Sequence, residues 1–125
     1  MPRHQLVDWY RAADVTAESF YAGAIGSVAL QSMACGTPVI MHLQIEPEPG
    51  GGRVFYPPQD LYPALPPIIR CGSEAEILRE LDNTVADPRR LAALRGESRD
   101  WIVRYSSADA LARRFEELYR GILAR

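Results

Sequence analysis

The chain has 125 residues, 47% hydrophobic and 24% charged, a composition that indicates one globular domain with enough apolar material for a core. Fourteen basic and sixteen acidic residues give a net charge of -2, which offers no positive surface for nucleic acid or an anionic membrane. All fourteen basic residues are arginines, so a Walker phosphate loop and a Schiff-base enzyme, which both need lysine, are excluded.

The first predicted elements are a helix over residues 3–13 and a strand over residues 14–18. The helix carries four residues at helical spacing, and we expect this face to belong to the core: Leu6, Trp9, Tyr10 and Ala13. The strand, from Asp14 to Glu18, is short and ends on an acidic residue.

A glycine turn leads from this strand into a second predicted helix, which stops at Gly36. Gly36 suits the left-handed position after a helix, Pro38 cannot continue one, and residues 39–41 then form a second apolar strand. We expect the helix to begin near Gly26 and Ser27, with its unpaired N–H groups facing an open crevice at the carboxyl end of the sheet. Such a helix start can hold a phosphate. The alternative, that the glycines only allow the chain to form the turn, stays open.

Residues 44–66 are rich in proline and glycine, which predicts a long loop over the same crevice. Its three consecutive glycines and Arg53 can contact a phosphate. The alternative, a mobile linker with a solvated arginine, stays open.

A third strand and three helices follow. The strand covers residues 67–71, and the next helix opens with a capping box at Ser73 and carries an apolar face formed by Ile77, Leu78, Leu81 and Val85. Asp87 and Pro88 start another helix, with an inner face formed by Leu91, Leu94, Trp101, Ile102 and Tyr105. Ser106 or Ser107 caps the last one, whose apolar residues are Leu111, Phe115, Leu118, Ile122 and Leu123.

Strands that alternate with helices predict an α/β fold in three layers: a short parallel sheet of about three strands with helices on both faces. Cys35 and Cys71 fit neither a redox pair nor a zinc set, and His4 and His42 lack partners at ligand spacing. We therefore expect no cofactor and no metal. The sequence contains neither a signal peptide nor an apolar span of membrane length, which predicts a cytoplasmic protein.

Two runs carry a resemblance to a known family: D-W-Y-R-A-A-D-V at residues 8–15 and G-S-V-A-L-Q-S-M-A-C-G-T-P-V-I at residues 26–40. They resemble the donor-binding half of GT-B type, group 1 glycosyltransferases, which typically read lYraADv and then G-x-V-A-L-E-A-M-A-C-G-T-P-V-I. Residues 87–119 are similar to the tail of the same enzymes. The resemblance covers nearly the whole chain except the loop, and it implies half of a Rossmann-like donor domain, with the acceptor domain and the first half of the donor domain absent.

In this family a pair of glutamates, eight positions apart, faces the sugar and the ribose of a nucleotide sugar. The corresponding positions here are Gly23 and Gln31, so both carboxylates are replaced. Gln31 can still accept a ribose hydroxyl, more weakly than an ionised group would. The resemblance implies a binding set for a UDP- or GDP-linked sugar: Gly23, Ala24, Ile25, Gly26, Ser27 and Gln31. Glu18, His42 and Arg53 are candidate accessory contacts; the alternatives, a surface glutamate at position 18 and a simple strand-end residue at position 42, stay open. No residue is assigned a catalytic role.

Two functions follow from these expectations. The chain is a donor-domain piece that transfers a glycosyl group only together with an acceptor domain, or it is an inactive interaction or scaffold module that kept the fold. Because the strand of residues 14–18 would be an edge, we also expect a homo-oligomer or a complementary chain to pair with it.

Overall fold

The computed structural model describes residues 2–21, 23–45 and 64–125. Most of the predicted Pro/Gly-rich loop, residues 46–63, lies outside the described residues. The elements, in chain order, are α1 (Arg3–Ala12), β1 (Thr16–Ala17), α2 (Ser27–Ala34), β2 (Val39–Met41), β3 (Ile69–Arg70), α3 (Glu74–Ala86), α4 (Pro88–Tyr105) and α5 (Ala108–Leu123).

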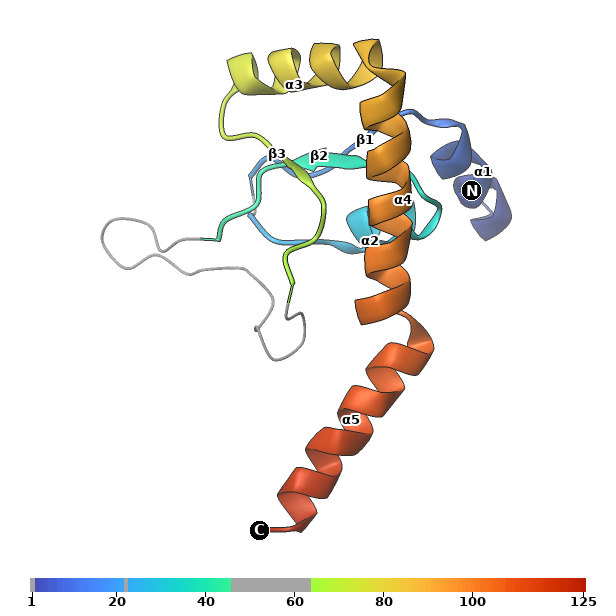
Figure 1. Ribbon diagram of the computed structural model, residues 1–125, viewed down its shortest axis with the longest axis vertical. Coiled ribbons are helices and arrows are strands. Elements are labelled where there is room, and N and C mark those ends of the chain that lie inside the picture. The colour runs from blue at the N-terminus through green and yellow to red at the C-terminus, as the bar shows by residue number, and fades with distance from the viewer. Residues whose placement is uncertain (1, 22, 46–63) are drawn as a thin grey trace, which may run out of the picture.

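The three strands form a parallel sheet in the order β1-β2-β3. Thr16 pairs with Val39 and Ile40 pairs with Ile69, so β2 is the central strand (Figure 1). The α/β class, the parallel pairing and the edge position of β1 among the described strands are confirmed.

The side chains of β2 alternate between two apolar clusters. Val39 and Met41 are fully buried in a cluster that α2 completes with Met33 and α4 completes with Ile102. Ile40 lies in a second cluster with Ile69 and Cys71, covered mainly by Ile77 and Leu81 of α3 and by Leu94 of α4. Helices therefore pack on both faces of the sheet, as expected for a three-layer fold.

The helix boundaries follow from local capping. The hydroxyl of Ser73 accepts a hydrogen bond from the Glu76 amide, and the Asp87 carboxylate accepts from the amides of Arg89 and Arg90. Ser107 is the cap of α5, through a bond from the Ala110 amide. Gly36 has a positive φ of 76° directly after α2. Each of these signals was readable in the sequence.

Several residues expected in the core are exposed. Trp9 is 67% exposed because α1 turns Leu6, Val7 and Tyr10, rather than Trp9, toward α2. Leu78 and Val85 of α3 are also exposed, since Ile77, Leu81 and the buried Thr84 take the sheet side.

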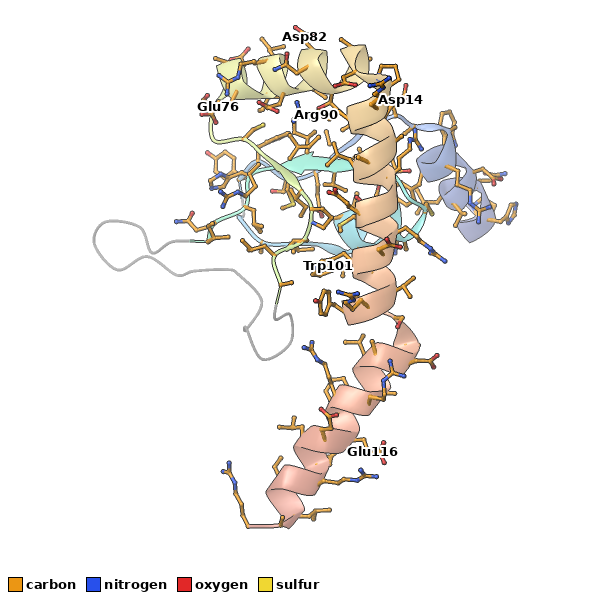
Figure 2. The ribbon with its side chains drawn as sticks, viewed as in Figure 1. Asp14, Glu76, Asp82, Arg90, Trp101 and Glu116 are labelled. Atoms are coloured by element: carbon orange, nitrogen blue, oxygen red, sulfur yellow. The ribbon has the colours of Figure 1, made fainter. Side chains whose placement is uncertain are left out.

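The apolar face of α5 is uncovered as well. Phe115, Leu118, Ile122 and Leu123 are between 49% and 86% exposed. Figure 1 shows the reason: α5 projects away from the sheet, beyond the end of α4. Glu116 in Figure 2 marks how far this helix extends from the core.

Candidate functional site

The turn before α2 is fixed by Gly23. This glycine is buried, has a φ of 64°, and accepts a hydrogen bond of 2.9 Å from the Gln44 amide through its carbonyl oxygen. A Cβ at this position would lie 2.7 Å from the Cβ of Gln44. The turn therefore lies against the segment after β2 and needs glycine on both conformational and steric grounds.

The helix α2 begins where the sequence predicted, with Gly26 as its N-cap and Ser27 as its first residue. Its amides are not all open, however. The carboxylate of Glu18, just after β1, accepts a 3.1 Å hydrogen bond from the Ala29 amide, and it also bonds the backbone of Gly26. A Cβ at position 26 would collide with Glu18 Oε1, so glycine makes room for this acidic group.

The environment of Glu18 sets its protonation. Desolvation by burial raises the pKa of this carboxyl above its ordinary value, and the bonds from Gly26 and Ala29 partly offset that rise. The side chain is half-buried, and it supplies the negative charge that a helix start favours. The open crevice expected at this helix start is thus taken up in part by the protein's own anion.

The other expected donor-binding residues lie around this turn. Ala24 and Ile25 are half-buried, and Ile25 packs against the cluster between α2 and β2. Gln31 is exposed and lines a cavity of about 170 Å³ between α1 and α2, with Leu6 and Tyr10 among its neighbours. Arg53 lies outside the described residues.

A different cavity, of about 290 Å³, lies at the carboxyl ends of β2 and β3. Its lining consists of His42, Leu43, Gln44, Ile45 and Arg70. Met41, the last residue of β2, pairs with Arg70 in the sheet, and His42 directly follows it. Gln44 connects this cavity to the Gly23 turn through its amide.

Of the expected residues, Gln31 lines one of these two cavities and His42 lines the other. Neither Arg70 nor Gln44 was predicted as a site residue from the sequence. Arg70 is the last residue of β3 and the next-to-last residue of the predicted strand 67–71, so comparing the residues near the carboxyl ends of the parallel strands would have found it.

The described residues offer hydrogen-bond acceptors, backbone amides and one arginine around this turn, which suits binding of a polar ligand. Within residues 2–21, 23–45 and 64–125 no three His, Cys, Asp or Glu side chains gather as metal ligands would. No described helix is long and apolar enough to cross a membrane.

The fold and the turn define an α/β protein with a glycine-capped helix at the end of a parallel sheet. No protein-family model matches the chain, and no solved structure is significantly similar to it. Named relatives do match. A D-inositol 3-phosphate glycosyltransferase of Thermobispora bispora is 35% identical over 128 residues, which cover 99% of this chain and 27% of the relative.

Two further relatives carry similar names. D-inositol 3-phosphate glycosyltransferase 1 of Catenulispora acidiphila is 37% identical over 98 residues, or 75% of this chain and 20% of the relative. The enzyme of Streptosporangium roseum is 60% identical over 38 residues, or 30% of this chain and 9% of the relative. The chain therefore spans at most 27% of the length of these curated relatives. The names of these relatives support the assignment of this chain to a glycosyltransferase family.

Proposed function

We propose that this chain is a donor-binding part of a glycosyltransferase and that it binds a UDP- or GDP-linked sugar. The observation that carries the proposal is the similarity along 99% of the chain to a D-inositol 3-phosphate glycosyltransferase. The glycine turn and the start of α2 at the carboxyl end of a parallel strand support it, because ligands of open α/β sheets bind at this edge.

In this proposal the sugar nucleotide lies along the turn of residues 23–27, and Gln31 accepts a hydrogen bond from a ribose hydroxyl. Transfer of the glycosyl group takes place only together with an acceptor-binding domain. The names of the relatives make D-inositol 3-phosphate the first acceptor to test once such a domain is supplied.

One observation favours a second function, an interaction or scaffold module without catalysis. The Glu18 carboxylate bonds the Ala29 amide at the helix start, and an anionic ligand there would meet this like charge. Gly23 and Gln31 also replace the two carboxylates expected from the resemblance.

Calorimetric titration of the chain with UDP, GDP and their sugar conjugates separates the two functions. We expect heat with one of these nucleotides, and an affinity gain of roughly tenfold in Gln31→Glu, because hydrogen bonds to an ionised acceptor are the stronger ones. Gln5→Glu makes the same chemical change at an exposed position of α1 and serves as the control. An absence of heat with every nucleotide would leave only the interaction module.

We further propose that β1 pairs with a second polypeptide, either another copy of this chain or a complementary one. Among the described strands β1 pairs with β2 alone, so its other side presents unpaired backbone groups. Phe20 and Tyr21, just beyond the strand, are 37% and 101% exposed. A pairing strand would bond the open edge and cover these two rings.

A further inference from the structure

The cavity at the carboxyl ends of β2 and β3 contains a cation that has no partner among the described residues. The Arg70 side chain is exposed and forms no hydrogen bond or ion pair with another described residue. A guanidinium presents five N–H donors in a planar fork, a geometry that matches the oxygens of a phosphate. Arg70 is therefore available to an anionic ligand.

Two further polar side chains line the same cavity. His42 follows β2 and is half-buried, and Gln44 lies two residues beyond it. The imidazole and the carboxamide both carry N–H groups that can donate to an oxygen. With a volume of about 290 Å³, the cavity has room for a phosphate or diphosphate group.

The position of Glu18 decides between two places for an anion. The start of α2 already holds a carboxylate, bonded to the Ala29 amide, whereas the described lining of the Arg70 cavity includes no acidic side chain. A phosphate at the helix start would approach a like charge, and a phosphate in the cavity would approach a guanidinium. Electrostatics therefore favours the cavity.

We propose that this cavity is an anion site in which Arg70, assisted by His42 and Gln44, binds the phosphate groups of the ligand. The inference rests on the proposed function for its natural ligand, the diphosphate of a nucleotide sugar. The link between the two is structural, because the Gln44 amide donates to the carbonyl of Gly23. A donor bound along the Gly23 turn would thus have its phosphates beside Arg70.

The test uses inorganic pyrophosphate as the probe and follows the backbone amides of the 125-residue chain by NMR. Saturable shifts are expected at His42, Gln44 and Arg70. Arg70→Gln should weaken the affinity roughly tenfold, the effect of losing a charged hydrogen bond, and Arg70→Lys should weaken it less because it keeps the charge. The control Arg113→Gln removes the same charge from the exposed side of α5 and should change the affinity by less than about twofold.

Equal affinities of wild-type and Arg70→Gln, shifts confined to the amides of residues 27–29, or no binding at all would overturn the anion site. A thermal melt of each variant verifies that it is folded, and Arg70→Lys keeps the test valid if Arg70→Gln does not fold.

Titrations with UDP and GDP separate this inference from the proposed function. If neither nucleotide binds but pyrophosphate binds in an Arg70-dependent way, the donor function fails and the anion site stands. If a nucleotide binds wild-type and Arg70→Gln equally well, the donor function stands and the anion site fails.

Discussion

At the residue scale, Glu18 and Glu80 are two carboxyl groups whose surroundings act in opposite directions. Burial raises the pKa of Glu18, while the hydrogen bond from Arg90, 2.6 Å long, lowers the pKa of Glu80. Figure 2 shows Arg90 at the start of α4, facing α3, from which Glu80 comes. The two groups therefore contribute to stability in different pH ranges.

The folded chain binds more protons at Glu18 than the unfolded chain between the ordinary pKa of 4.5 and the raised value. The stability that Glu18 contributes is thus complete below pH 4.5 and is lost as the pH rises through the folded pKa. Glu80 has the opposite sign, since its contribution is present above 4.5 and is lost as the pH falls through its lowered pKa.

Urea unfolding of Glu18→Gln and Glu80→Gln between about pH 3 and about pH 8 tests these signs. Relative to wild-type, Glu18→Gln should become more stable as the pH rises, and Glu80→Gln should become less stable. Parallel pH profiles for the two variants would contradict the assignment.

Gly26 is a second residue whose identity the structure explains. In Gly26→Ala the new methyl group must push the Glu18 carboxylate off the Ala29 amide, which we expect to cost about 1 kcal/mol of unfolding free energy, the typical value of a lost cap. In a Glu18→Ala background the same substitution should cost less, because no carboxylate has to move. Denaturant unfolding of the four variants measures this coupling.

Gly96→Ala is the matched control for the Gly26→Ala substitution. Gly96 lies within α4, and no described neighbour comes within 4 Å of the place that a new methyl group would occupy. Alanine should therefore stabilise the chain by up to about 1 kcal/mol through helix propensity. A Gly26→Ala cost that is the same with and without Glu18 would show that the carboxylate is not the cause.

At the scale of elements, β1 has one bonded side and one free side among the described strands. The amides of Thr16 and Glu18 donate to the carbonyls of Pro38 and Ile40. Because neighbouring residues of a strand direct their amides to opposite sides, the Ala17 amide points to the open edge. A substitution that removes the Ala17 amide can therefore test whether β1 pairs with a second polypeptide, without breaking the bonds between β1 and β2.

Ala17→Pro removes this outward amide and should abolish pairing along β1 while the fold persists. Thr16→Pro, which removes an amide bonded to the Pro38 carbonyl, should instead unfold the chain. Light scattering at micromolar concentration measures the oligomeric state of each variant, and a thermal melt shows whether it is folded. A wild-type chain that is strictly monomeric would argue against self-pairing and leave only a complementary chain as the partner.

At the scale of the whole molecule, signals between residues close in sequence predicted the order of the helices and strands. Contacts between residues far apart in sequence could not be predicted. Ser73, Asp87 and Gly36 mark helix ends through bonds to residues three or fewer positions away, or through their own backbone angle, and all three were readable. Periodicity identified an apolar face on α5, but the sequence could not reveal that this helix leaves the core. The turn before α2 lies where it was predicted, yet the proximity of Arg70 to His42 depends on sheet register, which a sequence does not specify.

The carboxylate at the start of α2 has one more consequence. A protein that depends on its substrate to neutralise a helix end becomes looser whenever that substrate is absent. Here the counter-ion is built into the polypeptide, eleven residues before the amide that it serves. The start of α2 therefore has a neutralising carboxylate in place whether or not a ligand is bound.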